Sequence, residues 1–320
     1  MKIIIIGYVN CKGEKMKIYL AFDIGGTKLK YALISEQGQL LKRYSESTIV
    51  SSKSEFIKRF NQIVDKFETQ ISGIGVSVPG KVDFQTQKIS FGGSLPFLDG
   101  ISFNEILNTR LPVFVENDAN AATLAEMWLG SLRDVNSGVM LVLGTAVGSG
   151  IMINKRLLYG VHQQAGEVSF VSYSKLDKEH MMGSQGSAVA LIEDIARNAK
   201  LSELDDGRAV FKMINQGNSY AVNRFKIFCQ NLASLIYNMQ TILDVERFVI
   251  GGGISQQSIV VKGINQALCD LRQTSSFVST TLEAPRVVSS RLYNDANLFG
   301  AISHFELRDV NNLSQNIEDN

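Results

Sequence analysis

Short apolar runs separated by glycine and polar residues begin at residue 17. They predict three consecutive β-strands, over residues 17–23, 29–34 and 40–44. The first run ends at Asp23 and is followed by Gly25 and Gly26. Runs of this length with glycine or polar turns between them are typical of antiparallel strands. The pattern therefore predicts a β-meander whose first corner is rich in glycine.

A helical period follows the predicted meander. Ser52 and Glu55 form a capping-box pattern. After them the apolar residues recur at helical spacing, at Phe56, Ile57, Phe60, Ile63, Val64 and Phe67. Two further strands are predicted, one over residues 74–78 that Pro79 and Gly80 end, and one over residues 113–115. The second leads through Glu116, Asn117 and Asp118 into an alanine-rich helix over residues 119–129.

A second strand–turn–strand unit repeats the first. Residues 139–143 and 151–153 predict two strands, which the glycine-rich segment 144–150 joins. The repetition predicts two similar halves, each with a glycine-rich hairpin. Beyond residue 185 the pattern is mainly helical. It is interrupted by predicted strands at 247–250 and 286–289, and a last helix is predicted over 295–307.

The length of 320 residues exceeds the usual size of one domain, so we expect two lobes with separate cores. Residues 17–130 are assigned to a small α/β lobe, which the helix over 295–307 completes. Residues 131–294 are assigned to a large α/β lobe, and residues 308–320 to a polar tail. Because Met16 stands directly before the first predicted strand, residues 1–16 are expected to be an N-terminal extension.

Composition and charge exclude several classes of partner. Hydrophobic residues make up 45% of the chain, charged residues 20%, and the net charge is +1 without a basic block, so nucleic acid is not indicated. No apolar run reaches the roughly 18 to 20 residues that span a bilayer, and no signal peptide is apparent. Cys11, Cys229 and Cys269 are too widely spaced for a metal cluster or a disulfide framework. These features favour a cytoplasmic protein without a membrane partner.

The glycine-rich hairpins are candidate phosphate-binding turns. In the segment Asp23–Lys28, Gly25 and Gly26 allow backbone N–H groups to approach phosphate oxygens, and Thr27 and Lys28 add donors. Asp23 is a candidate to hold Mg²⁺ through water. The alternative is an ordinary hairpin turn. Gly144 and Thr145 repeat this chemistry in the second half, and two such turns indicate a nucleotide better than one does.

Three further segments carry candidate chemistry. Gly251–Gly253 follows a strand, so a base or ribose can lie against its backbone, and the alternative is a plain turn. Asp118 can accept the proton of an attacking hydroxyl and Asn117 can orient the substrate, although both residue types also favour helix N-caps. Glu167 can accept hydrogen bonds from neighbouring sugar hydroxyls, or is simply a surface residue.

These motifs, together with residues 75–80 and 295–301, resemble the ROK family (repressors, open reading frames and sugar kinases) over about residues 17–305. The resemblance implies a two-lobed, actin-like α/β fold of the ribonuclease H-like class with a central cleft. It also implies transfer of the γ-phosphoryl group of ATP, with Mg²⁺, to a hexose hydroxyl, usually O6. A homodimer or homotetramer is expected on the same ground.

The resemblance also implies roles for individual residues. Asp118 is implied to be the catalytic base, Asn117 and Gly80 to bind the sugar, and Glu167 to contact the hydroxyls near the anomeric carbon. The residues implied to bind phosphate, metal or nucleotide are Asp23, Gly25, Gly26, Thr27, Lys28, Gly144, Thr145, Gly252 and Gly253.

The chain departs from the family pattern beside the sugar. Phe170 stands where many members have a histidine, and residues 180–193 lack the cysteines of the family's zinc cluster, so we expect no structural zinc. Ala146 and Ser149 replace glycines in the second phosphate turn. The altered pocket favours glucose or a β-glucoside such as cellobiose, with N-acetylmannosamine left open.

Two other classes of function are considered. A repressor of this family carries a DNA-binding domain before the first phosphate motif. Only 22 residues precede Asp23, too few for such a domain, so a repressor is not expected. A sugar-binding protein without catalysis remains the other alternative, and sugar-dependent consumption of ATP would separate it from a kinase.

Overall fold

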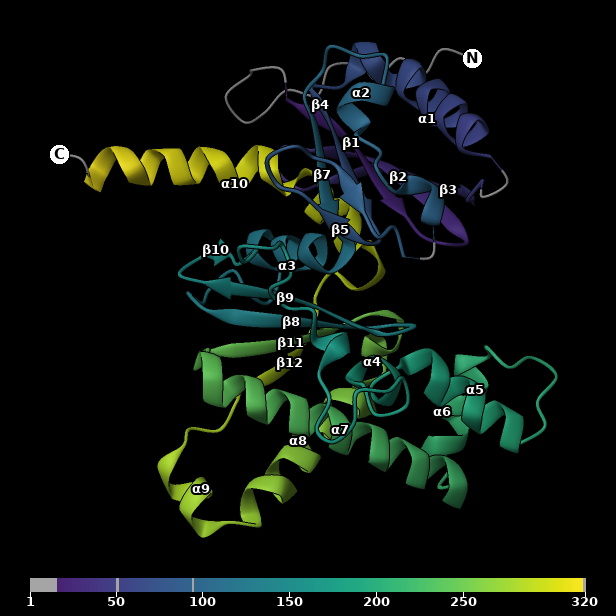
Figure 1. Cartoon of the computed structure of the whole chain (residues 1–320), viewed down its shortest axis with the longest axis vertical. Helices are drawn as coiled ribbons and strands as arrows, with labels where there is room; N and C mark the ends of the chain where they lie inside the picture. The colour runs from purple at the N-terminus through teal and green to yellow at the C-terminus, as the bar shows by residue number, and fades with distance from the viewer. Residues whose placement is uncertain (1–15, 50–51, 94, 319–320) are drawn as a thin grey trace. The chain divides into compact units, whose positions relative to one another are not determined.

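The computed structural model, shown in Figure 1, describes residues 16–49, 52–93 and 95–318, with side chains up to Leu307. The chain divides into two compact units. Unit 1 comprises the chain up to Leu129, the short segment Val161–Gln163 and the chain from Asp295 onward. Unit 2 comprises Gly130–Gly160 and Gln164–Asn294. The expected N-terminal extension lies outside the described residues, apart from Met16, which is buried.

Unit 1 contains a five-stranded sheet in the order β3-β2-β1-β4-β7. The strands β1 (Ile18–Ile24), β2 (Lys28–Ser35) and β3 (Leu40–Ser47) form an antiparallel meander. The strands β4 (Gly73–Val78) and β7 (Val113–Asn117) add to β1 in parallel. A two-stranded ribbon, β5 (Lys81–Val82) with β6 (Ile89–Ser90), lies between them in sequence. The carboxyl ends of β1, β4 and β7 therefore meet at one edge of the sheet.

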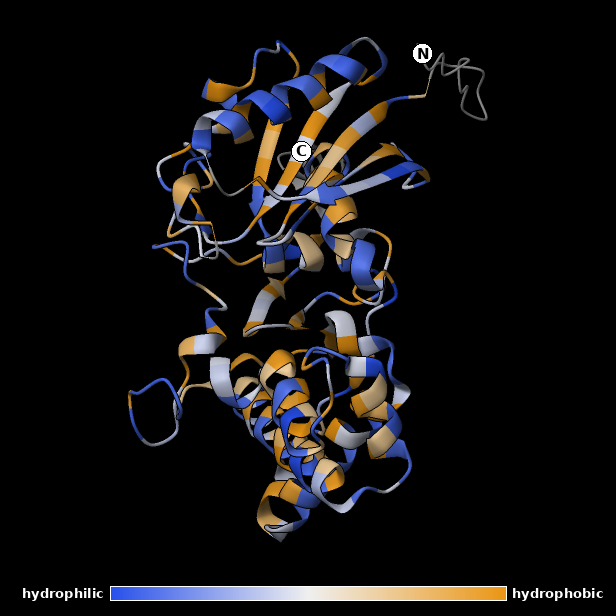
Figure 2. Cartoon of the chain, turned by 90° about the vertical axis from the view of Figure 1, so that its right-hand side faces the viewer, coloured by the Kyte–Doolittle hydropathy of each residue, from blue (hydrophilic) through white to orange (hydrophobic). Residues whose placement is uncertain are grey.

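The first helix of unit 1 buries one apolar face. In α1 (Lys53–Phe67) the Ser52 side chain accepts a hydrogen bond from the backbone N–H of Glu55, which confirms the predicted start of the helix. Its apolar face packs with the sheet in one hydrophobic core, and Figure 2 shows hydrophobic residues along the strands of this unit. The other helical segments are η1 (Glu68–Gln70), η2 (Pro96–Leu98), α2 (Phe103–Ile106), α3 (Asp118–Trp128) and α10 (Ala296–Glu318).

The helices α3 and α10 pack at very close range. A Cβ atom at Gly300 would overlap the carbonyl oxygen of Ala121, so only glycine fits at this crossing. On the other side of α10, a Cβ atom at Gly75 of β4 would overlap the carbonyl oxygen of Ala301. These close approaches hold α10 between the sheet and α3, and so fix the position of α3, which begins with Asp118.

Unit 2 repeats the sheet of unit 1, in the order β10-β9-β8-β11-β12. Here β8 (Gly138–Leu143), β9 (Val147–Ile153) and β10 (Arg156–Leu157) are antiparallel, and β11 (Arg247–Gly251) and β12 (Val287–Ser289) are parallel to β8. Its helical segments are η3 (Val168–Phe170), α4 (Met182–Gln185), α5 (Ala188–Asn198), α6 (Gly207–Asn215), α7 (Ser219–Leu243), η4 (Gly253–Gln256), α8 (Ser258–Gln273) and α9 (Ser276–Thr281). A single turn, η5 (Tyr293–Asp295), precedes α10.

The predicted α/β class and the repetition of the hairpin are confirmed, since each unit contains a five-stranded mixed sheet. The two-residue strands β5, β6 and β10 are not predicted, because two residues carry no periodic pattern. The last helix was expected to end at Leu307 and instead continues to Glu318. No proline or glycine occurs in residues 308–318 to end it.

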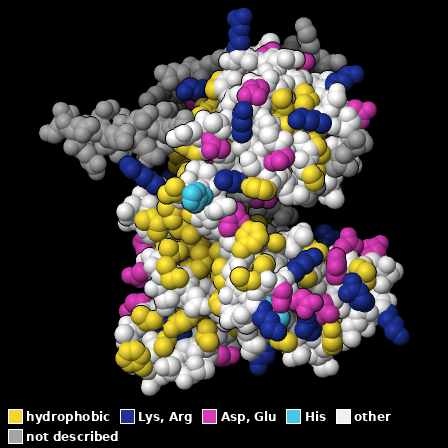
Figure 3. Space-filling model, in the orientation of Figure 1, with side chains coloured by type: hydrophobic (Ala, Val, Ile, Leu, Met, Phe, Trp, Pro, Cys, Tyr) yellow, Lys and Arg dark blue, Asp and Glu magenta, His cyan; other side chains and the backbone are white. Residues whose placement is uncertain are grey.

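The described part of the chain contains no helix with the length and apolar character needed to cross a bilayer. Cys229 is buried, Cys269 is exposed, and neither is in a disulfide. On the face shown in Figure 3, basic and acidic side chains are interspersed over both units. This fits the nearly equal numbers of the two kinds of charge, 32 basic and 31 acidic residues.

Candidate functional site

The corner between β7 and α3 presents an ordered carboxylate to solvent. Asp118 is the first residue of α3 and is exposed. Its Oδ1 accepts hydrogen bonds from the backbone N–H of Ala119 at 2.8 Å and from the side-chain amide of Asn117 at 3.2 Å. The N-terminus of a helix favours negative charge. Asp118 is therefore held in one orientation and can accept a proton from a hydroxyl group placed beside it.

Asn117 is the residue that caps α3. Its Oδ1 accepts hydrogen bonds from the backbone N–H groups of Ala119 at 2.9 Å and Asn120 at 3.1 Å. Its Nδ2 donates to the carbonyl oxygen of Gly80 at 2.8 Å. The N-cap alternative raised for this segment thus holds for Asn117. The same hydrogen bonds link Asp118 to the end of β4.

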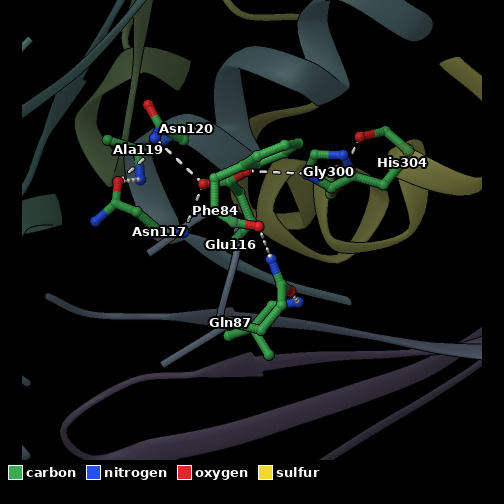
Figure 4. A network of polar contacts seen from close by, with 10 residues as sticks. Phe84, Gln87, Glu116, Asn117, Ala119, Asn120, Gly300 and His304 are labelled. Atoms are coloured by element: carbon green, nitrogen blue, oxygen red, sulfur yellow. Dashed lines mark hydrogen bonds and ion pairs between the residues drawn. The ribbon is translucent and has the colours of Figure 1, made fainter. Parts of the chain in front are cut away.

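A buried carboxylate lies directly behind this corner (Figure 4). Oε1 of Glu116 accepts hydrogen bonds from the backbone N–H of Asn117 at 2.9 Å and from Nδ2 of Asn120 at 3.2 Å. Oε2 lies 2.9 Å from Nε2 of His304 on α10. Only 2% of Glu116 and 7% of His304 is exposed. Glu116 therefore joins the start of α3 to α10 through both of its oxygens.

Gln87 supports β7 from the side that has no neighbouring strand. Its Oε1 accepts a hydrogen bond from the backbone N–H of Val115 at 2.7 Å, as Figure 4 shows. Because β7 is the edge strand of its sheet, this N–H would otherwise lack a ladder partner. The side chain thus anchors the strand that leads into Glu116, Asn117 and Asp118.

Gly80 is required by its backbone geometry. Its φ is +93°, and a Cβ atom there would overlap the carbonyl oxygen of Phe91. The residue lies two positions after the end of β4, and its carbonyl oxygen accepts the hydrogen bond from Asn117. Gly80, Asn117 and Asp118, three of the residues expected to bind or activate the sugar, are thus brought together in unit 1.

The turn between β1 and β2 carries two backbone N–H groups without a protein partner among the described residues, those of Gly26 and Thr27. Two of its carbonyl groups are engaged, since Thr48 donates to Gly25 through Oγ1 at 2.7 Å and to Thr27 through its backbone N–H at 3.0 Å. Thr27 and Lys28 are exposed. Unpaired N–H groups at such a turn can bind an anion such as phosphate.

Asp23 stands directly before this turn and is held from two sides. Oδ2 lies 2.9 Å from Nζ of Lys30, and Oδ1 accepts a hydrogen bond from Nδ2 of Asn297 at 3.0 Å. Only 7% of the residue is exposed. Each carboxylate oxygen has two lone pairs, so Asp23 retains acceptor capacity for a metal-bound water while both partners stay in place. The carboxylate thus fits an indirect contact to Mg²⁺, which keeps several waters in proteins.

The hairpin between β8 and β9 repeats the unpaired donors. The backbone N–H groups of Thr145 and Ala146 have no protein partner in the part of the chain that the structure describes. The carbonyl oxygen of Gly144 accepts hydrogen bonds from the backbone N–H groups of Ala188 at 3.0 Å and Val189 at 3.3 Å. The turn is therefore fixed to the first turn of α5.

A cavity of about 390 Å³ opens beside this hairpin, wholly within unit 2. Its volume lies in the range of sites for small molecules and cofactors. Gly144 and Gly253 both line it, so two of the glycines expected to bind nucleotide meet there. The apolar residues of the wall are Leu143, Ala188, Val189, Ile192, Phe211 and Ile254, and the polar side chains are Arg208, Gln256, Gln257 and Asn294. An apolar slot with a few polar groups suits a flat heterocyclic base.

Gly252 allows a close backbone contact beside this cavity. Its φ of +86° and ψ of +173° belong to a region that is essentially restricted to glycine. A Cβ atom there would overlap the carbonyl oxygen of Leu143. The residue thus allows the end of β11 to lie against the end of β8, which brings Gly253 and Gly144 to the same cavity.

Glu167 is positioned by β9. Ser149 donates a hydrogen bond from Oγ to the carbonyl oxygen of Gly166 at 2.7 Å, and a Cβ atom at Gly166 would crowd Ser149. Glu167 follows and is exposed, yet neighbouring protein atoms partly desolvate its carboxyl group and raise its pKa above the ordinary value. Ser149, expected only to be tolerated in place of glycine, is thus a structural contact.

The segment after Glu167 contains the departures from the family pattern. Phe170 is 66% exposed. In the segment expected to lack zinc, His180 lies with Nδ1 2.6 Å from Oδ1 of Asp177. Among the described residues, no group of three or more His, Cys, Asp or Glu side chains is arranged to hold a metal ion.

Several residues of these sites are not predicted from the sequence. His304 and Lys30 contact candidate site residues, but an isolated basic residue in a strand or helix carries no local signal. Ile192 and Phe211 line the cavity, yet in the sequence they match the apolar faces of ordinary helices. Asn297 belongs to the segment 295–301 that was singled out, although without a role.

Comparisons with known proteins agree with this picture. The family model described as ROK family matches residues 19–306. A β-glucoside kinase of Listeria innocua is 28% identical over 91% of this chain and 97% of its own length. A glucokinase of Thermotoga maritima is 28% identical over 90% of this chain and 97% of its own. The crystal structure of a ROK family protein from Streptococcus pneumoniae in complex with sucrose superposes with a TM-score of 0.81, at 28% identity over 92% of this chain and 99% of the other.

Proposed function

The chain belongs to the ROK family, and on this premise we propose that it is an ATP-dependent sugar kinase that phosphorylates a hexose hydroxyl, O6, of glucose or a glucose-like sugar. The observation that carries the proposal is Asp118, an exposed carboxylate fixed at a helix N-terminus by hydrogen bonds from Asn117 and Ala119. Because ATP is the donor, we assign the reaction to the cytoplasm.

In the proposed reaction, unit 1 supplies the acceptor side. Asp118 takes the proton from the sugar hydroxyl as that oxygen attacks the γ-phosphorus, and the bond from phosphorus to the leaving ADP oxygen breaks. Asn117 holds Asp118 and, with Gly80, contacts the sugar. The hydrogen bonds of Asn117 to the helix and to Gly80 fix its amide, so its contact to the sugar would use the Nδ2–H that Asp118 accepts at 3.2 Å.

The nucleotide is proposed to bind residues of both units. The cavity lined by Gly144, Gly253 and Phe211 would take the adenosine part of ATP, with its apolar wall against the base. The unpaired N–H groups of the two glycine-rich turns would bind phosphate oxygens, those at Gly26 and Thr27 together with Lys28, and those beside Gly144 together with Thr145. Mg²⁺, held through water by Asp23, would offset charge on the transferred phosphoryl group.

The identity of the sugar is proposed from the departures in unit 2. Glu167 would accept hydrogen bonds from hydroxyls near the anomeric carbon, and the exposed Phe170 in place of histidine makes that side more apolar. One relative phosphorylates β-glucosides by name, another glucose, and the streptococcal protein binds sucrose, a two-ring sugar. We therefore favour glucose or a β-glucoside, with N-acetylmannosamine as the remaining alternative. A homodimer or homotetramer is proposed as well, and sedimentation analysis would test it.

A panel assay tests the proposal. Purified protein with MgATP is given glucose, cellobiose, a phenyl β-glucoside or N-acetylmannosamine, and release of ADP is followed with and without sugar. Sugar-dependent release, with a sugar phosphate identified by mass spectrometry, is the expected result. Binding of a sugar without any release of ADP would favour the second candidate, a sugar-binding regulator without catalysis.

A further inference from the structure

An aromatic side chain stands in an unusual position beside the acceptor site. Phe91 follows β6 and is 76% exposed, although Ile89 before it and Leu95 after it are fully buried. Its φ is +54°, a left-handed conformation that bulky residues rarely adopt. A single exposed aromatic residue is ordinary on a protein surface. One that also adopts a left-handed backbone conformation is uncommon, and such an outlier motivates a hypothesis about function.

The surrounding residues fix this conformation. The backbone N–H of Phe91 donates to Oδ1 of Asp99 at 2.8 Å, and its carbonyl oxygen accepts from the N–H of Gly93 at 2.6 Å. Leu95 and Leu98 anchor the following turn in the core of unit 1. The loop is thus built so that the Phe91 side chain stays outside the core.

The loop borders the proposed acceptor site directly. A Cβ atom at Gly80 would overlap the carbonyl oxygen of Phe91, and one at Gly93 would lie 3.5 Å from Cβ of Pro79. The carbonyl oxygen of Gly80 in turn accepts the hydrogen bond from Asn117, which also contacts Asp118. Gly80 therefore lies against both the backbone of Phe91 and the side chain of Asn117, which is proposed to bind the sugar.

A cavity of about 320 Å³ lies over this loop, within unit 1, lined by Phe91, Gly92, Gly93, Pro96 and Asp99. The absence of side chains at Gly92 and Gly93 keeps one wall open, and Phe91 and Pro96 give flat apolar surface. Asp99 adds a carboxylate that accepts hydrogen bonds from hydroxyl groups. A ring with one apolar face and hydroxyls at its edge, or an aromatic ring, matches these walls.

We propose that this cavity is a subsite for the second ring of the substrate, the aglycone or second sugar of a β-glucoside, with Phe91 as the surface on which that ring stacks. The inference rests on the proposed kinase function and narrows it to a substrate class. Phosphoryl transfer to the first ring is unchanged, and the second ring contributes binding energy only. Phe91 thus determines specificity and takes no part in the chemistry.

The test compares substrates in the full-length protein. We expect a higher kcat/KM for cellobiose and a phenyl β-glucoside than for glucose. Phe91→Asn removes the ring and inserts a residue that tolerates positive φ. It should lower kcat/KM for both glucosides by about tenfold or more, mainly through KM, because burial of an aromatic ring is lost. Glucose, which has no second ring, should lose much less, and Phe91→Tyr should retain the preference.

Phe277 provides the matched control, since it is 75% exposed on α9 of unit 2. Phe277→Asn should leave the ratio of kcat/KM values unchanged. An equal loss on glucose and glucosides in Phe91→Asn, or a wild-type protein that phosphorylates glucose and rejects glucosides, would overturn the inference while the kinase function stands. If no sugar is phosphorylated, the proposed function fails. In that case calorimetric titration with cellobiose tests the subsite separately. An affinity for cellobiose that is the same in Phe91→Asn as in the wild type refutes it.

Discussion

In unit 1 the first hairpin is preceded by the buried carboxylate Asp23, which Lys30 and Asn297 contact. In unit 2 the corresponding hairpin, between β8 and β9, contains no charged residue from Gly138 to Ile153. Both hairpins nevertheless present two consecutive N–H groups that have no protein partner among the residues the structure describes. Both hairpins can thus bind an anion through backbone N–H groups. A carboxylate, Asp23, stands directly before the turn in unit 1, whereas the hairpin of unit 2 carries no charge.

The parallel strands extend this comparison. A glycine with positive φ follows each of β4 and β11: Gly80, two residues after β4, has a φ of +93°, and Gly252, directly after β11, has a φ of +86°. The next strands differ, since β7 leads into Glu116, Asn117 and Asp118, whereas β12 leads into the neutral Ser290. Backbone geometry therefore follows the shared topology. We place the proposed proton chemistry in unit 1, and unit 2 contains a cavity lined mainly by apolar and neutral residues together with Arg208.

The largest expected effect comes from removing the carboxylate of Asp118, the proposed base in unit 1. Asp118→Asn should lower kcat by about a hundredfold or more, because the amide cannot accept the proton of the sugar hydroxyl. Sugar affinity, measured by calorimetry, should change little. Asp65→Asn, an exposed position on α1, is the control. Turnover close to that of the wild type would remove Asp118 from the role of base.

Gly252, which directly follows β11, allows a test of the backbone conformation that the two units have in common. Gly252→Ala should lower the free energy of unfolding by about 1–3 kcal/mol, the usual cost of a residue in this backbone region, and raise KM for ATP. Its neighbour is a matched control for stability, because a Cβ atom at Gly253 would meet no atom within 4 Å. Urea unfolding of both variants measures the difference in stability, and ATP titration of Gly252→Ala measures the change in KM. Equal behaviour of the two would show that the close approach to Leu143 does not shape the cavity.

A smaller effect is expected behind the acceptor site. Glu116→Gln keeps an oxygen for Asn117 but removes the charge that faces His304. Misplacement of Asp118 should then lower kcat by about tenfold. KM for ATP should stay unchanged, because Asn117, Asn120 and His304, which Glu116 contacts, are not proposed to bind ATP. Glu105→Gln, an exposed position, is the control. A rise in KM for ATP equal to the fall in kcat would contradict a role confined to unit 1.

Much of this arrangement could be predicted from the sequence, because it depends on local pattern. Apolar runs, glycine turns and the strand-to-helix corner at Asp118 identify the sheets and the candidate base. The contact between Glu116 and His304 could not be predicted, since 188 positions separate them and only the packing of α10 brings them together. The cavity in unit 2 could not be predicted from the sequence either. Phe211 has the same apolar pattern whether its helix faces a core or a ligand.

The smallest effect concerns a charge in unit 2 that serves structure. Nη1 and Nη2 of Arg247 donate to the two carboxylate oxygens of Asp134 at 2.6 and 3.2 Å, and these hydrogen bonds lower the pKa of Asp134 from 3.8 to about 2. A pKa lowered by folding stabilises the protein above pH 3.8, and this contribution is lost as the pH falls through about 2.

Asp134→Asn should therefore lower Tm slightly at pH 7, since the carboxylate is largely exposed, and the difference from wild type should vanish near pH 2. Thermal unfolding across this pH range measures it, with Asp65→Asn again as the control. The kinetic constants should not change in Asp134→Asn, because neither Asp134 nor Arg247 belongs to the proposed sugar or nucleotide sites. A fall in kcat comparable to that of Glu116→Gln would show that the two units do not divide these roles.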